Sequence, residues 1–177
     1  MELYCGTYKK YNEGSLEGAW INLDDFADAD DFRKACLELH KDEDDPELMF
    51  QDINIDHDWE EKLYSECAIP EDYWDVKEAI KNSYIDDDIF DAFMSIEGGR
   101  PDVNTVKRCE ECYITHISDS MNPGADYAEM EFEDTHSREE LKSLEWIMRY
   151  IDWDAVWRDM TFDGYHEENG YIFDTNR

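Results

Sequence analysis

The chain has 177 residues and carries 48 Asp and Glu against 16 Lys and Arg, a formal net charge of −32. A field of that sign repels phosphate at every approach, which excludes direct binding to DNA. Aromatic residues make up 14% of the chain, which indicates a packed core and argues against an acidic disordered segment.

Residues 1–60 are predicted to form two strands, a helix and a third strand. The runs 3–8 and 18–23 are typical of strands, and the turn signal at 12–14 lies between them. Asp28 is suited to cap the helix, and the acidic run 42–45 forms a loop before a strand at 48–55. The helical period predicts a buried stripe of Phe32, Ala35, Cys36 and Leu39.

Residues 61–103 are predicted to be helical. One helix begins near Pro70, and a second is opened by the acidic run 86–88. The Gly-Gly-Arg-Pro run at 98–101 breaks the second helix and forms a linker. The predicted buried positions are Tyr73, Val76 and Ile80 in the first helix, and Ile89, Ala92, Phe93 and Ile96 in the second.

Residues 104–177 mix both element types. A strand is predicted at 112–117, a turn at 122–124, and a helix at 138–150. A short helix capped by Asp152 follows, and the Asn-Gly step at 169–170 favours a type I′ hairpin. The side chains predicted to point inward from the helix at 138–150 are Leu141, Leu144 and Met148.

No chemical motif in the chain is complete, so we expect no enzyme activity, no cofactor and no bound metal. Cys109 and Cys112 have the spacing of metal ligands, but no second pair of ligands follows. The acids lack the Gly of a calcium loop, and the five histidines are isolated. A nuclease-like set of Asp45 with residues 60–62 is expected by chance in so acidic a chain.

Neither a run of apolar residues that could span a bilayer nor a signal peptide is recognised. Five scattered cysteines suit reduced thiols, so the expected location is the cytoplasm. We therefore expect no membrane partner.

The acidic charge is spread along the whole chain. Residues 1–60, 61–104 and 105–177 carry net charges of −13, −8 and −11. Because duplex DNA has two charges per base pair, 32 charges correspond to roughly 16 base pairs. The composition is thus compatible with a mimic of DNA. The alternatives are a halophile's solvated surface, an acidic module that binds a partner, and an enzyme.

Two regions resemble the ArdA family of antirestriction proteins. The first is residues 4–52, with the sequence YCGTYKKYNEGSLEGAWINLDDFADADDFRKACLELHKDEDDPELMFQD. The second is IDWDAVWRDM at 151–160, followed by an acidic hairpin at 168–173. The internal antirestriction motif of the family corresponds to residues 126–135, DYAEMEFEDT.

The resemblance implies a DNA mimic carried on mobile genetic elements, which binds type I restriction–modification enzymes and blocks their DNA-binding groove in the bacterial host cell. It also implies an elongated α+β chain of three small domains that forms a homodimer through the C-terminal one. We place an α/β N-terminal domain at 1–60, a helical middle domain at 61–103 and an α/β C-terminal domain at 104–177. The rival interpretation is an acidic interaction module that binds a basic, histone-like protein.

The residues predicted to contact the enzyme are carboxylates in acidic runs, which would take the place of phosphates. They are Asp24, Asp25, Asp28, Asp30, Asp31, Asp42, Glu43, Asp44, Asp45, Asp86, Asp87, Asp88, Asp126, Glu129, Glu131, Glu133 and Asp134. We predict a second, shorter set of residues for contact between two copies of the chain, because aromatic residues and Met are enriched at the centres of protein interfaces. The candidates for the dimer interface are Trp146, Met148, Trp153 and Trp157, for which core packing is the alternative role.

Overall fold

In the computed structural model, which describes residues 1–177, the first three strands form an antiparallel sheet in the order β2-β1-β3. All three strands were predicted from the sequence. A short helix, α1 (Tyr8–Asn12), follows β1 and was not predicted; the Thr7 side chain caps it by accepting a hydrogen bond from the backbone of Lys10. The strands are β1 (Glu2–Thr7), β2 (Ala19–Asn22) and β3 (Leu48–Asn54).

Helix α2 (Ala29–Leu39) covers one face of this sheet. It begins as predicted, because the Asp28 carboxylate accepts a hydrogen bond of 2.9 Å from the backbone of Asp31. Phe32 and Cys36 are buried in the core. The prediction for Leu39 was wrong: this side chain is 39% exposed, since the helix ends there.

Four helices form the middle of the chain, and two of them were predicted. Asp86 caps α5 through the backbone of Ile89, as its acidic run indicated. The sequence did not predict α6, whose start is fixed by a capping box between Asp102 and Thr105. The helices are α3 (Asp58–Glu61), α4 (Asp72–Lys81), α5 (Asp87–Glu97) and α6 (Val103–Cys112).

One hydrophobic cluster of 22 buried residues joins the first sheet to these helices. It extends from Leu3 in β1 through Trp59 and Tyr73 to Phe93 in α5. The thiols of Cys109 and Cys112 also lie in it, and all five cysteines are free. The sheet and the middle helices therefore share a core, and the division of the chain into three domains stays a prediction.

A second antiparallel sheet, with the order β4-β6-β5, follows α6. Its hairpin turns at Asn169 and Gly170, whose φ angles of 54° and 85° are those of the predicted type I′ turn. Phe173 of this sheet packs against Phe93 of α5, with ring centroids 5.6 Å apart. The strands are β4 (Tyr113–His116), β5 (Tyr165–Glu168) and β6 (Tyr171–Asp174).

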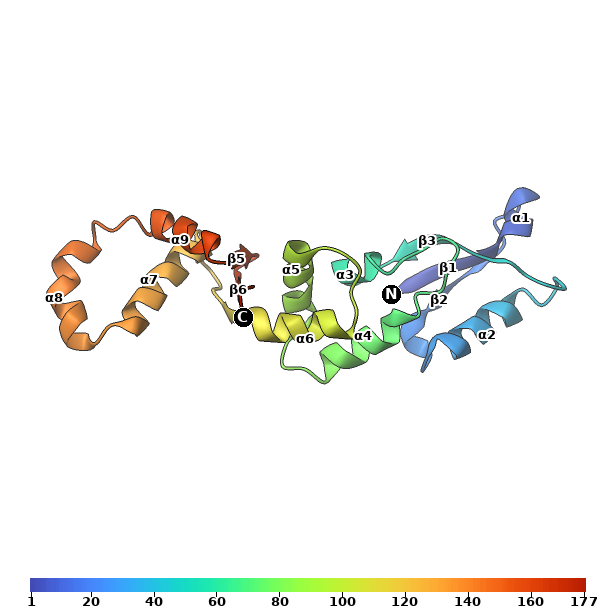
Figure 1. Ribbon diagram of the computed structural model, residues 1–177. Helices are drawn as coiled ribbons and strands as arrows, with labels where there is room; N and C mark the ends of the chain where they lie inside the picture. The colour runs from blue at the N-terminus through green and yellow to red at the C-terminus, as the bar shows by residue number, and fades with distance from the viewer.

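Three further helices occupy the end of the molecule remote from the first sheet (Figure 1). The turn predicted at 122–124 is instead the start of α7: Asn122 is the N-cap and Pro123 occupies the first turn, where its missing N–H costs nothing. Leu141, Leu144 and Met148, predicted to point inward from the helix at 138–150, are the partly covered residues of α8, but none of them is buried. The helices are α7 (Pro123–Thr135), α8 (Arg138–Met148) and α9 (Trp153–Phe162).

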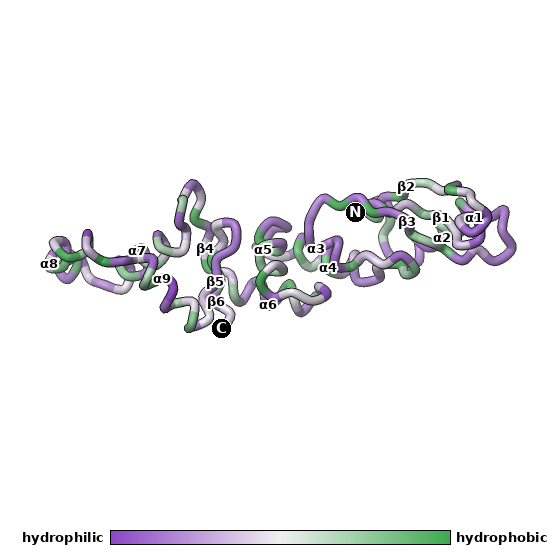
Figure 2. The backbone as a smooth tube through the Cα atoms, turned by 90° about the horizontal axis from the view of Figure 1, so that it is seen from above, coloured by the Kyte–Doolittle hydropathy of each residue, from purple (hydrophilic) through white to green (hydrophobic).

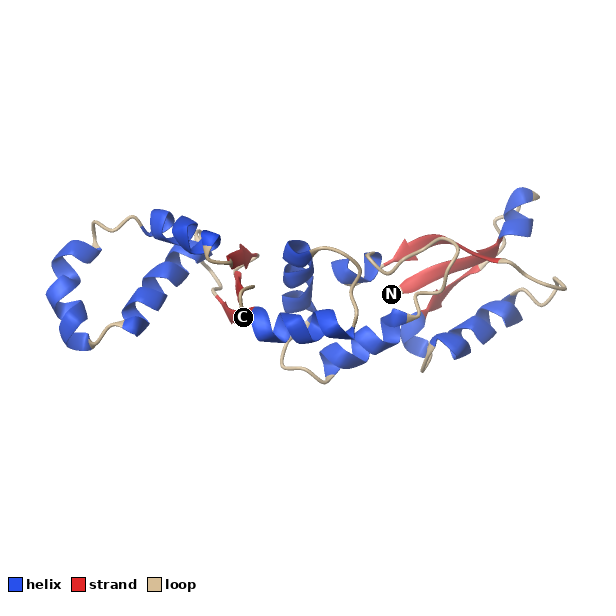
Figure 3. Ribbon diagram, in the orientation of Figure 1, coloured by secondary structure: helices blue, strands red, loops and turns tan.

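The elements follow one another along one long axis, so the molecule is elongated (Figures 1 and 3). The two small sheets and the surrounding helices confirm the α+β fold class. Seen from above, hydrophilic segments recur along the whole length (Figure 2). None of the helices combines the length and the apolar character that crossing a membrane requires.

Candidate acidic surface

The seventeen carboxylates singled out in the sequence are all accessible. None of them is buried, and only Glu43, Asp87, Glu129 and Glu131 are partly covered. They do not converge on one pocket. The acidic runs lie around α2 at one end, at the start of α5 in the middle, and on α7 toward the other end (Figure 1). The carboxylates thus form an extended surface.

Several of these carboxylates also hold the fold together. Asp28 and Asp86 cap helices, and Glu43 accepts a hydrogen bond of 2.7 Å from the Thr7 hydroxyl. Asp42 accepts a bond of 3.1 Å from the nearly buried ammonium group of Lys10. That bond lowers the pKa of Asp42 and raises the pKa of Lys10. These acids therefore have a structural role whether or not they bind a partner.

Other carboxylates of the set have no such role. Eight of the seventeen make no side-chain hydrogen bond and no ion pair within the chain, so their charge is directed only at solvent. They are Asp25, Asp30, Asp44, Asp45, Asp88, Glu129, Glu133 and Asp134. Free carboxylates of this kind are available to a cationic partner without any loss of internal contacts.

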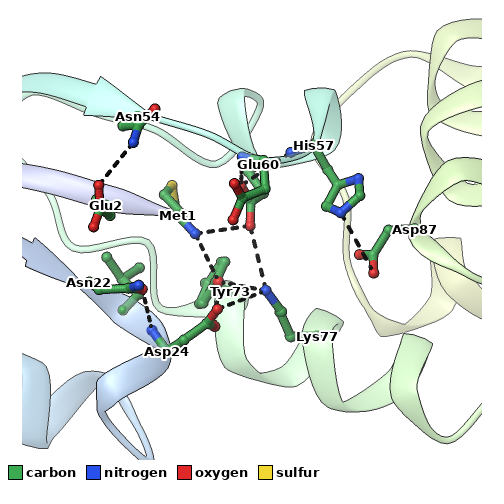
Figure 4. A network of polar contacts seen from close by, with 12 residues as sticks. Met1, Glu2, Asn22, Asp24, Asn54, His57, Glu60, Tyr73, Lys77 and Asp87 are labelled. Atoms are coloured by element: carbon green, nitrogen blue, oxygen red, sulfur yellow. Dashed lines mark hydrogen bonds and ion pairs between the residues drawn. The ribbon is translucent and has the colours of Figure 1, made fainter.

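A polar network in the interior joins the first sheet to α3 and α4 (Figure 4). The buried Glu60 carboxylate lies 3.2 Å from the amino group of Met1, which is also 3.2 Å from the Tyr73 hydroxyl. That hydroxyl donates to Asp24 at 2.7 Å, and Lys77 reaches Asp24 at 3.1 Å. Asp24 is thus a component of the network that links two parts of the molecule.

The environment of Asp24 alters its acidity. Burial alone would raise the pKa of this carboxyl. The hydrogen bonds from Tyr73 and Lys77 outweigh that effect, and they hold the pKa of Asp24 below its usual value. The pKa of the Tyr73 phenol shifts in the opposite direction, because burial and the adjacent carboxylates of Asp24 and Glu60 raise it. The carboxylate therefore stays charged inside the network.

The acidic run at the start of α5 lies beside residues that the sequence did not single out. Asp87 accepts a hydrogen bond of 3.0 Å from the indole nitrogen of Trp59, and its carboxylate lies 3.9 Å from His57. His57 also approaches Asp91 at 3.3 Å. Burial raises the pKa of Asp91. His57 and Asp87 are about thirty positions apart in the sequence, so no local pattern predicted that they would meet.

Other exposed acids were missed because they lie outside the acidic runs at 24–31, 42–45, 86–88 and 126–134. They lie on β3, on α3 and the turn before it, on α4, and on α8. Examples are Asp52, Asp56, Asp58, Glu61, Asp75, Glu78, Glu139 and Glu145. Composition alone pointed to them, since it shows that acids are spread along the whole chain. They extend the acidic surface between the three predicted acidic regions.

The largest hollow does not contain a catalytic set. It has a volume of about 650 Å³ and lies between α2, the loop before β3 and the start of α4. Its charged walls are two ion pairs, Arg33 with Glu71 at 3.4 Å and Arg100 with Asp72 at 2.9 Å. Asp45 lines it and Glu60 does not, so the nuclease-like set is not assembled there. No group of three or more potential ligands has the geometry to hold a metal ion.

The aromatic residues proposed for a dimer interface fall into two groups. Trp153 and Trp157 pack α9 against α7: Trp153 lies 5.5 Å from Phe132 and Trp157 lies 6.1 Å from Tyr127, between ring centroids. Trp146 on α8 is 66% exposed, and Met148 is partly exposed. Only α8 therefore presents free apolar side chains from this set.

Comparison with known protein families gives a match over nearly the whole chain. The family model described as "Antirestriction protein (ArdA)" matches residues 3–173. The match includes the middle of the chain, between the two regions that resemble the family in sequence. No curated protein matches the chain.

Proposed function

Because the chain belongs to the ArdA family of antirestriction proteins, we propose that it inhibits type I restriction–modification enzymes by mimicking duplex DNA. Antirestriction activity and a restriction–modification target follow from the family, which is one of inhibitors and not of enzymes. That the chain mimics DNA, and that it occupies the DNA-binding groove of the enzyme, are our inferences. The observation that carries it is a net charge of −32 spread over an elongated body.

The charge density around α2 supports the mimic. Residues 24–45 contain ten acids and three bases, a net charge of −7. Most of this charge lies in the segments that flank α2: the helix itself carries three acids and two bases, whereas residues 24–28 and 40–45 together carry seven acids and one base. A basic groove that normally holds phosphates would meet these carboxylates at both ends of the helix.

The mechanism that we propose is competitive occupancy. Carboxylates on helices and loops pair with the Lys and Arg side chains that normally hold phosphates in the enzyme's groove. Each exposed pair contributes only about 0.2–1 kcal/mol, so affinity arises from many pairs acting together. The spread of acids along the axis favours this mechanism over the acidic module for a histone-like protein, which would need only one compact patch.

We also propose a homodimer formed through the C-terminal region. Helix α8 contributes nothing to the buried core, and it carries Leu141, Leu144, Ile147 and Met148 along one side. Two chains of charge −32 repel each other, so a contact between copies has to be apolar. Such a contact becomes stronger as salt screens the repulsion.

The test of the proposed function is displacement of DNA. A fluorescent duplex that contains the recognition sequence is bound to a purified type I enzyme, and the protein is titrated in at several salt concentrations. We expect the duplex to be released, and the affinity of the protein to fall as salt rises. Failure to release the duplex, or binding that is independent of salt, would reject the mimic.

A further inference from the structure

The first sheet has one covered and one open face. Leu3 and Cys5 of β1 point into the core against α2, and Tyr4 between them points to the opposite side, as alternation along a strand requires. Figure 1 shows α2 and α4 beneath the sheet and no helix over the centre of its upper face. The upper face is therefore left without an intramolecular partner.

The centre of this open face is aromatic. Tyr4 and Trp20 meet edge to face with ring centroids 5.5 Å apart. With Leu16 and Gln51 they line a hollow of about 310 Å³, and we name these four residues the sheet-face patch. Leu16 is 67% exposed and Trp20 is 47% exposed. Exposed Trp and Leu side by side are typical of interaction sites on soluble proteins.

The sheet-face patch is already organised for binding. The Tyr4 hydroxyl donates a hydrogen bond of 2.9 Å to the carbonyl of Leu16, which ties the loop before β2 to the sheet. Gly18 makes this close approach possible, since a side chain there would strike the Cys5 carbonyl and the Tyr4 ring. Little conformational entropy remains to be lost when a partner binds.

One polar group of the sheet-face patch is left unsatisfied. The side-chain nitrogen of Gln51 is buried and has no hydrogen-bond acceptor within the chain. The amide lies over Gly6, where a Cβ atom would be only 2.6 Å from this nitrogen. An unsatisfied buried donor is unfavourable, but this nitrogen is covered by the chain itself, so it does not identify the partner.

The charges at the edge of the patch indicate what kind of partner fits. Glu17 next to Leu16 has a side chain that is 74% exposed, and the exposed Asp52 lines the hollow. A second copy of this chain would place carboxylates against carboxylates. A surface with an apolar centre and Lys or Arg at its edge is complementary in both respects.

We propose that the sheet-face patch docks on such a surface of the restriction enzyme, beside the DNA-binding groove that the carboxylates occupy. This inference rests on the proposed function. It adds an apolar contact to the ion pairs, one that phosphates cannot make. Since burial of apolar area is not screened by salt, this contact maintains affinity when ion pairs weaken.

The test is Trp20→Ala in the displacement assay, with Leu16→Gln as a second variant and Met121→Ala as the control. Met121 is fully exposed and lies outside both the patch and the acidic runs. We expect Trp20→Ala to raise Kd about tenfold, as loss of a central aromatic side chain does. The slope of log Kd against log salt should not change, since no charge is removed, and Met121→Ala should bind like the wild type.

The other outcomes are distinguishable. Unchanged Kd in both Trp20→Ala and Leu16→Gln, with folding confirmed by circular dichroism, would overturn the docking proposal and leave the mimic intact. A drop in sedimentation mass for Trp20→Ala would overturn it in favour of a contact between copies. If the wild-type protein does not displace DNA at all, the proposed function fails, and the docking proposal fails with it.

Discussion

Four carboxylates near the first sheet offer a sharp test of mimicry, because they have no role in the fold. Asp25, Asp30, Asp44 and Asp45 are exposed and make no hydrogen bond or ion pair through their side chains. Changing all four to Asn removes four charges and leaves the helix caps and the interior network in place. Stability should stay the same or rise slightly, because fewer like charges repel one another.

The expected loss of affinity follows from the exposure of these groups. An exposed ion pair contributes about 0.5 kcal/mol, so four such pairs contribute about 2 kcal/mol, which is about thirtyfold in Kd. Asp30→Asn alone should weaken binding only about twofold to threefold. Binding by the fourfold variant should also depend less on salt, since fewer charges are screened.

The assay is titration against a type I enzyme with labelled DNA at two salt concentrations. The matched control has Glu at the same four positions, which preserves the charge and should keep Kd within about threefold of the wild type. Wild-type affinity in the fourfold Asn variant would refute the role of these carboxylates. Loss of all inhibition from Asp30→Asn in a folded protein would indicate one discrete recognition site instead.

Three further predictions concern assembly and stability. Leu144→Asp on α8 should shift sedimentation in moderate salt from twice the 21.1 kDa chain mass to the monomer, and a wild-type monomer would contradict the proposed dimer. Tyr73→Phe should lower the unfolding free energy by about 2 kcal/mol at pH 7 in urea titrations, because the hydrogen bond to Asp24 is lost. Because folding lowers the pKa of Asp24, this stabilisation is present above the usual pKa of 3.8 and is lost as pH falls through the lowered pKa. A difference in unfolding free energy between wild type and Tyr73→Phe that does not narrow at pH 3 would exclude this explanation. Gly124→Ala should lower the thermal midpoint, because a Cβ there would strike the indole of Trp157, and an unchanged midpoint would show that α7 and α9 separate freely.

Much of the local structure was predictable because its causes lie within a few residues. Asp28 and Asp86 each precede a helical apolar period, and both cap the helix that follows. The Asn169–Gly170 turn follows equally from local preference, since both residues adopt positive φ at low cost. The start of α7 shows the limit of such signals: Asn122 and Pro123 suit a turn and a helix N-terminus alike, and the local sequence does not decide between them.

The candidate surface was predictable where acids stand in runs and not where they stand singly. Acidic runs are solvated almost wherever they occur, so their exposure follows from desolvation cost alone. Glu60 shows the opposite case, since it is an acid in an acidic segment and is nevertheless fully buried. Its burial depends on the amino group of Met1 and on Lys77, which come from other elements. No spacing in the sequence encodes that pairing.

By itself the sequence determined the family, the α+β class and the acidity spread along the chain, because motifs, periodicity and charge are properties of the residues and their order. Tertiary structure alone decided which carboxylates are free and which hold the fold, and which apolar residues are left at the surface. Trp153 is covered by α7, whereas Trp20 and Trp146 remain exposed. The sequence does not distinguish these three tryptophans. Whether each side chain is covered depends only on which elements pack against it.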